Sequence, residues 1–129
     1  MLDGVSGVVV PVTNLAKAQD FYMSKLGIRN KLATDGTSYV ALQSSGQAIF
    51  LLTPTPEFPF EGRPGPGAGL MFTVKDIDGT IKELKKRGVD VGAPMAGPGG
   101  QKVALFRDQD GNNLGLLQPA GKSANKRGV

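Results

Sequence analysis

Histidine and cysteine, the side chains that most often bind metals or act as base and nucleophile near neutral pH, are both missing from this chain. Their absence excludes thiolate chemistry, disulfides, zinc sites of the Cys/His type, and Ser-His-Asp or Cys-His couples. Acid or base catalysis would need an Asp, Glu, Lys or Tyr with a shifted pKa. Six acidic residues fall on predicted helices, caps or turns, where we expect them to be solvated: Asp20, Asp35, Asp76, Asp78, Glu83 and Asp90.

Three motifs resemble ligand loops but have the wrong spacing. Residues 108–112, DQDGN, begin like a calcium loop, which needs glycine at its sixth position and glutamate at its twelfth. Here glycine is fourth and Pro119 is twelfth, so we expect a hairpin turn. The glycine-rich runs GPGAG (65–69) and GPGGQK (97–102) lack the spacing and the following helix of a phosphate-binding loop. We expect both to be ordinary loops.

The composition is that of one globular domain: 129 residues, 40% hydrophobic and 20% charged. The net charge of +4 arises mostly in the tail, where Lys122, Lys126 and Arg127 stand without an acid. Without these three, 12 basic and 11 acidic residues leave +1, so a nucleic-acid surface is not expected. No apolar run reaches the roughly 18 residues of a membrane span. The N-terminus lacks a signal-peptide pattern, so the expected location is cytoplasmic, with no membrane contact.

The elements that must position any site occur twice. IFLLTP (49–54) returns as LGLLQP (114–119), and each half opens with an apolar strand and a capped amphipathic helix. The first half predicts a strand at 7–12, a helix from about 15 to 25 capped by Asn14, and strands at 38–44 and 48–54. The second half predicts strands at 69–74, 89–91, 102–108 and 114–119, and a helix at 77–87 capped by Asp76. The chain is thus a tandem duplication with module one at 5–54, a Pro/Gly-rich linker at 55–67, module two at 68–119, and a flexible basic tail at 120–129.

Three segments carry a resemblance to a known family: VTNLAKAQDFYMSKLGI, FTVKDIDGTIKELKKRGVDV and the closing LFRDQDGNNLGLLQ. They resemble the helix openings and the F-x-D-P-D-G-N signature of the vicinal oxygen chelate superfamily, with Gln109 where proline is usual. That superfamily includes glyoxalase I, extradiol dioxygenases and bleomycin-resistance proteins. The resemblance implies an α+β fold, a single glyoxalase-like domain over residues 1–119, in which tandem βαβββ modules form a curved mixed sheet around a cavity.

The resemblance also implies where a metal would be held. Its metal enzymes place one ligand on each of four strands, typically two His and two Glu. Carried over by position, these fall on Gly7, Phe50, Gly69 and Gly115, and none of the four has a metal-binding side chain. We therefore expect no metal and no cofactor. In place of the metal site we expect an open space that the apolar side chain of Phe50 partly fills.

Strand alternation places further residues on the same faces as those four positions. The predicted ligand-binding cavity comprises Gly7, Val9, Tyr39, Phe50, Leu52, Gly69, Met71, Thr73, Asn113 and Gly115. Two alternatives stay open: the glycines could mark a bulge or chance replacement, and Phe50 could fill a void as readily as stack on a ligand. Tyr39, which is included in this cavity, and Gln43, Lys102 and Arg107 could add polar contacts, but the sequence leaves the register of all four open.

The resulting hypothesis is a small-molecule binding protein, a homodimer that sequesters a drug or metabolite. Its ligand is expected to be neutral or anionic and partly apolar, since the near-neutral fold offers no acidic groove for a cation. Three rivals remain: a metal-free enzyme whose catalytic residues are unknown, a metal-dependent lyase or dioxygenase of the glyoxalase type, and a purely structural partner protein whose cavity is filled by Phe50, Met71 and their neighbours. Of the two enzymes, the metal-dependent one is the less favoured. The second rival needs a divalent ion to chelate vicinal oxygens, for which the chain lacks histidine.

Overall fold

The structure is a computed structural model that describes residues 3, 7–53, 64–65 and 69–120. The chain divides into two compact units, Met1–Gly65 and Pro66–Val129, and each is described by itself. Their boundary falls within the predicted linker at 55–67. Apart from residues 64–65, that linker lies outside the described residues, as does the predicted tail beyond residue 120.

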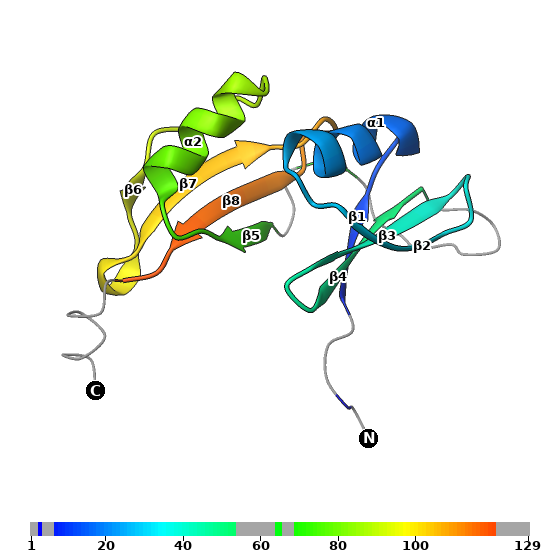
Figure 1. The fold of residues 1–129 in the computed structure, drawn as a ribbon, viewed down its shortest axis with the longest axis horizontal. Coiled ribbons are helices and arrows are strands. Elements are labelled where there is room, and N and C mark those ends of the chain that lie inside the picture. The colour runs from blue at the N-terminus through cyan, green and yellow to red at the C-terminus, as the bar shows by residue number, and fades with distance from the viewer. Residues whose placement is uncertain (1–2, 4–6, 54–63, 66–68, 121–129) are drawn as a thin grey trace. The chain divides into compact units, whose positions relative to one another are not determined.

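Unit 1 is a four-stranded sheet with one helical segment (Figure 1). Its strands lie in the order β1-β4-β3-β2, with β1 parallel to β4 and the other neighbours antiparallel. The elements are β1 (Gly7–Pro11), α1 (Leu15–Gln19), the π-helix η1 (Asp20–Lys25), β2 (Asn30–Thr34), β3 (Tyr39–Ser44) and β4 (Gln47–Leu52). The order pairs the first and last strands of the unit with each other and leaves β1 and β2 at the two edges of the sheet.

The helical segment of unit 1 begins as predicted and then departs from α geometry. Asn14 caps α1 by accepting a hydrogen bond from the Lys17 backbone N–H at 3.0 Å. From Asp20 the chain forms a π-helix, whose wider turn carries the Leu26 N–H to the Phe21 carbonyl. The prediction of one continuous helix over 15–25 was therefore wrong in type. The adjacent Phe21 and Tyr22 of this segment are both buried, and their rings pack edge to face with centroids 5.5 Å apart.

The strands of unit 1 include one that sequence patterning did not predict. β2 is exposed at every residue and pairs with β3 across a bulge between Lys31 and Ala33, so it shows no apolar alternation. The β3–β4 hairpin follows the sequence closely. Its two loop residues, Ser45 and Gly46, have φ of 50° and 88°, as a type I′ turn requires.

Unit 2 repeats this arrangement, in the order β5-β8-β7-β6 with β5 parallel to β8. Its elements are β5 (Leu70–Thr73), α2 (Ile77–Lys86), β6 (Met95–Ala96), the 3-10 turn η2 (Pro98–Gly100), β7 (Lys102–Arg107) and β8 (Asn113–Gln118). The same pairing in both units confirms the duplication. The strand predicted at 89–91 was wrong: Val91 makes a single bridge to Phe106, and the paired edge strand forms later, at β6.

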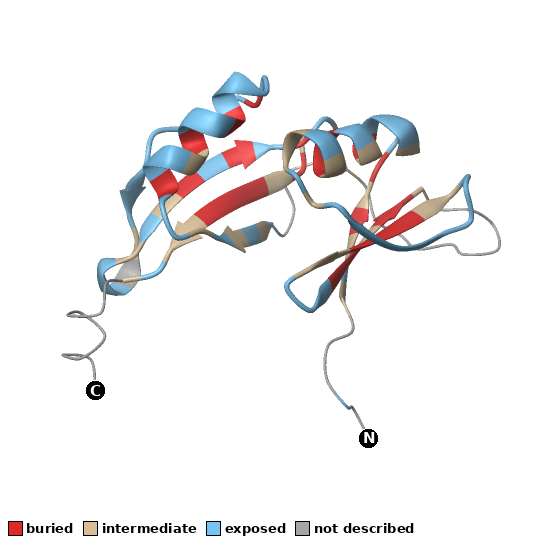
Figure 2. Ribbon diagram, in the orientation of Figure 1, coloured by how far each residue is buried: buried red, intermediate tan, exposed pale blue. Residues whose placement is uncertain are grey.

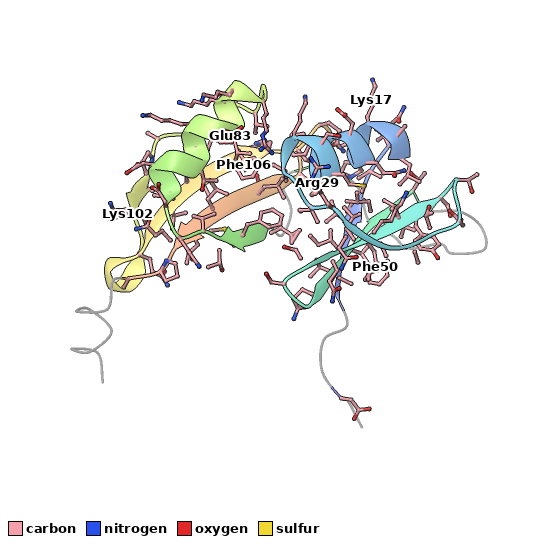
Figure 3. The ribbon with its side chains drawn as sticks, viewed as in Figure 1. Lys17, Arg29, Phe50, Glu83, Lys102 and Phe106 are labelled. Atoms are coloured by element: carbon pink, nitrogen blue, oxygen red, sulfur yellow. The ribbon has the colours of Figure 1, made fainter. Side chains whose placement is uncertain are left out.

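Each helix buries its apolar stripe on one face of its own sheet (Figure 2). In unit 2, Ile77, Ile81 and Leu84 of α2 are buried as predicted, and Phe106 of β7 lies beneath that helix (Figure 3). The buried residues of unit 1 include the alternate residues Val40 and Leu42 of β3. Within the described residues, no helix combines the length and apolar character needed to span a bilayer. The helix-covered faces are cores, and the opposite faces are where a ligand could bind.

Candidate functional site

The open face of unit 1 is defined here as the sheet face opposite its core-facing residues Val10, Val40 and Leu51. Phe50 of β4 aligns with Val9 on one side and Ala41 on the other, and Leu52 aligns with Tyr39. In Figure 3 Phe50 lies on the side of its sheet away from α1. By this register the open face of unit 1 comprises Gly7, Val9, Pro11, Tyr39, Ala41, Gln43, Ala48, Phe50 and Leu52. All five predicted site residues of module one are therefore on one face.

The open face of unit 2 is defined in the same way, as the face opposite Ala104, Phe106 and Leu116. Gly115 of β8 aligns with Met71 of β5 and Leu105 of β7. The open face of unit 2 comprises Gly69, Met71, Thr73, Met95, Val103, Leu105, Arg107, Asn113, Gly115 and Leu117. The five predicted site residues of module two also share a face.

At Gly115 a neighbouring side chain occupies the space that a larger residue would need. A Cβ at position 115 would overlap the Met71 sulfur and lie 3.0 Å from the Met71 methyl carbon. The Met71 thioether therefore covers the glycine. Methionine is long and adaptable, so this cover can move aside at small cost. Gly115 itself is buried while Met71 is 47% exposed, which makes Met71 the outer surface at this point.

At the equivalent positions of unit 1, the large and the small side chains are exchanged between the two strands. Phe50 corresponds to Gly115 in the repeat and Val9 to Met71, and each pair is aligned across two parallel strands. The Phe50 ring reaches over Gly7, where a Cβ would lie 2.9 Å from Cε2 of that ring. Phe50 thus packs against its own sheet through Gly7. This contact favours the void-filling interpretation of Phe50 over ligand stacking.

The two open faces differ in exposure. On unit 1, Leu52 is 1% exposed and Ala41 is 3% exposed, although both lie on the open face. On unit 2, Met71, Met95 and Leu105 are each about half exposed. An exposed group of large apolar side chains on a folded protein commonly marks an interaction surface. Unit 2 therefore presents the stronger candidate surface.

Strand pairing resolves the polar residues whose register the sequence left open. Arg107 aligns with Asn113 and lies on the open face of unit 2, whereas Lys102 aligns with Gln118 on the helix-covered face. Gln43 lies on the open face of unit 1, where its Oε1 accepts a hydrogen bond from Asn30 Nδ2 at 2.9 Å. Leu105 and Met95 were not among the predicted site residues. β7 has apolar side chains on both faces, so only its register with β8 shows that Leu105 lies on the open face of unit 2.

Tyr39 is positioned by an acidic turn just before β3. The Asp35 carboxylate accepts hydrogen bonds from the backbone N–H groups of Thr37, Ser38 and Tyr39, and from the Ser38 hydroxyl. These bonds, led by that of the Ser38 hydroxyl, hold the pKa of Asp35 well below its usual range. The carboxylate is committed to the turn, so its role here is structural.

The acidic run 108–112 is a structural turn, as the sequence predicted. Asp108 is buried, and its Oδ1 accepts from the backbone N–H groups of Asp110 and Asn112, both at 2.9 Å. Its Oδ2 accepts from Asn112 Nδ2 at 2.8 Å. Gly111 supplies the positive φ, 80°, that closes the hairpin between β7 and β8. The turn fixes the register that sets Arg107 opposite Asn113.

The comparison with protein-family models decides the family. Residues 4–116 match the model of the Glyoxalase/Bleomycin resistance protein/Dioxygenase superfamily. The chain belongs to this superfamily. A comparison with curated proteins found no match.

Solved structures of the superfamily share the fold. TnmS3, an antibiotic binding protein from Streptomyces sp. CB03234, is 31% identical, with a TM-score of 0.75 over 92% of this chain and 98% of its own. A glyoxalase/bleomycin resistance protein from the same organism is also 31% identical, with a TM-score of 0.69 over 89% and 100%. Lactoylglutathione lyase from Agrobacterium tumefaciens is 18% identical, with a TM-score of 0.77 over 92% and 95%. At that identity the lyase shows the fold alone.

The residues at the four metal positions that the superfamily implies do not fit a metal ion. Gly7, Gly69 and Gly115 have no side-chain donor, and Phe50 is a hydrocarbon ring packed on Gly7. Elsewhere in the described ranges, no three His, Cys, Asp or Glu side chains gather into a metal-binding group.

Proposed function

We propose that this chain is a small-molecule binding protein of the superfamily that sequesters a drug or metabolite. The observation that carries the proposal is the open face of unit 2, where Met71, Met95 and Leu105 stay about half exposed around the methionine-covered Gly115. Binding sites for small molecules are mostly apolar with a few polar groups, and Asn113, Thr73 and Arg107 supply those groups here. The 31% identity to TnmS3 over nearly its whole length supports the same function.

We propose binding without metal-dependent turnover. Glyoxalase-type chemistry uses a divalent ion to polarise two neighbouring oxygens, and the four implied positions lack the donor atoms to hold one. A metal-free enzyme would need an acid or base on an open face. At the register positions of the two open faces, Tyr39 is the one side chain that could act as an acid or base, and no Asp, Glu or Lys joins it, which favours binding over catalysis. We further propose a homodimer as the assembly in which the open faces are covered.

Native mass spectrometry of protein purified without added metal or chelator tests the proposal. We expect a metal-free protein that retains the mass of an added apolar aromatic compound, or one acquired from the cell. Replacing Met71 and Leu105 with Asp should abolish retention, while Lys82→Asp on the exposed side of α2 should not. A stoichiometric divalent ion that survives dialysis would contradict the proposal and favour the metalloenzyme.

A further inference from the structure

We propose that the open face of unit 2 selects a flat apolar ligand carrying an anionic group, which Arg107 binds. This inference rests on the proposed function and adds the chemical class of the ligand. Arg107 ends β7 on the same face as Leu105, Met71 and Gly115. It is the one charged residue at the register positions that define the two open faces.

Arg107 has its guanidinium available for a ligand. Within the part of the chain that the structure describes, its side chain makes no ion pair or hydrogen bond. The adjacent carboxylate, Asp108, is buried and accepts hydrogen bonds from Asp110 and Asn112 of the 108–112 turn. An arginine beside exposed apolar surface is suited to a planar anion, because its fork donates two parallel hydrogen bonds and its plane also stacks on aromatic rings.

Strand geometry sets the distance between the apolar and the charged parts of this face. Leu105 and Arg107 are two residues apart on β7, as Gly115 and Asn113 are on β8. Residues two apart on a strand are separated by about 7 Å on the same face. A fused bicyclic aromatic ring lying over Leu105 and Met71 would therefore bring a carboxylate on its far ring to Arg107. The Asn113 position, aligned with Arg107, adds a neutral polar group at the same end.

The test compares two probes of the same shape, 2-naphthoate and its uncharged amide 2-naphthamide, on the full chain. Binding is followed through the methyl signals of ¹³C-methionine in NMR spectra. Met71 and Met95 report on the open face of unit 2, and Met23 in η1 is the internal control. We expect both probes to shift the Met71 signal, with 2-naphthoate binding about fivefold more tightly, as for an exposed ion pair, and losing this advantage at high salt.

Variants assign the selectivity to the guanidinium. Arg107→Gln should equalise the two affinities, and Arg107→Lys should restore only part of the preference, because lysine keeps the charge without the fork. Lys102→Gln is the matched control, since it removes a cation from the same strand but from the opposite face. Equal binding of the two probes to the wild type overturns the selection of an anion and leaves small-molecule binding intact. Absence of any Met71 shift with either probe contradicts both proposals.

Discussion

Two glycines of the open faces illustrate how neighbouring atoms decide what a position tolerates. At Gly7 a new Cβ would meet the Ala48 backbone oxygen, and it would lie 2.9 Å from both Ala48 Cβ and the Phe50 ring. At Gly115 its closest neighbour would be the flexible end of Met71. Backbone in a paired strand cannot move without breaking the ladder, whereas a methionine can change rotamer. The same substitution should therefore have unequal costs at the two positions.

We expect Gly7→Ala to lower the free energy of unfolding by about 2 to 3 kcal/mol through overpacking, and Gly115→Ala by less than about 1 kcal/mol. Urea denaturation measures both values. Combining Met71→Ala with Gly115→Ala provides the control: in that background the alanine at 115 should cost nothing further, because the overlapping sulfur is gone. Equal losses for the two single variants would show that Met71 does not move aside.

The lowered pKa of Asp35 predicts that the stability of the fold depends on this residue's titration only under acidic conditions. Its pKa is lowered in the folded chain, so its contribution to stability is present above the unfolded pKa of about 3.9 and is lost as the pH falls through the folded value. Asp35→Asn keeps an oxygen for the backbone N–H groups but removes the charge. We expect Asp35→Asn to melt below the wild type at neutral pH and the two melting temperatures to converge below about pH 3.9. Calorimetry across this range tests it, with Asp78→Asn as control; a pH-independent difference would count against it.

At the scale of elements, α1 and α2 both begin with a side-chain N-cap, although they lie in different units. Asp76 caps α2 by accepting the Gly79 N–H at 3.1 Å, as Asn14 caps α1. A Cβ at position 79 would lie 3.1 Å from the Asp76 carboxyl carbon, so the glycine leaves room for the cap. Helix caps of this kind satisfy donors that the first turn cannot pair internally.

We expect Asp76→Ala to lower the free energy of unfolding by about 1 kcal/mol. Asp76→Asn, which retains the accepting oxygen, should recover most of this loss. Asp78→Ala is the comparison, since it removes an acid of the first turn that does not form the cap, and the loss of its interaction with the helix dipole should cost roughly 0.3 kcal/mol. Denaturant unfolding of the three variants gives the values. A loss from Asp78→Ala as large as that from Asp76→Ala would mean that charge, and not the cap, stabilises α2.

The elements also show where sequence information ends. The stripe of Ile77, Ile81 and Leu84 repeats at helical spacing, so α2 and its buried face were predictable. The change from α1 to the π-helix at Asp20 was not, because residues 20–25 carry no proline or glycine that would mark a change of helix type. β2 escaped prediction because an exposed edge strand needs no apolar alternation.

The candidate site, too, was predictable only in part. The resemblance to the superfamily, with which the alignment of the two halves agrees, placed Gly7, Phe50, Gly69 and Gly115 at equivalent strand positions. Strand register groups Gly7 with Phe50 on the open face of unit 1, and Gly69 with Gly115 on the open face of unit 2. The position of Arg107 on the open face could not be read from the sequence. It depends on which face of β7 turns toward α2, and that is set by the 108–112 turn and the pairing with β8.

At the scale of the whole molecule, the duplication supplies two sheets that each have one covered face and one open face. About half of the surface of Met71, Met95 and Leu105 is exposed on unit 2. Folded chains seldom leave such a group uncovered unless a ligand or another chain binds there. A charge of +1 outside the three basic tail residues gives little electrostatic repulsion between copies. Both features favour self-association of this chain.

We therefore expect the chain to sediment as a dimer at micromolar concentrations, because association removes the exposed apolar side chains from water. Leu105→Asp should shift the population toward the 13.4 kDa monomer, whereas Lys82→Asp, on the exposed side of α2, should not. A chain ending at Ala120 lacks Lys122, Lys126 and Arg127 and should dimerise equally well at low and high salt. A monomer at every concentration would contradict the coverage of the open faces by a second copy.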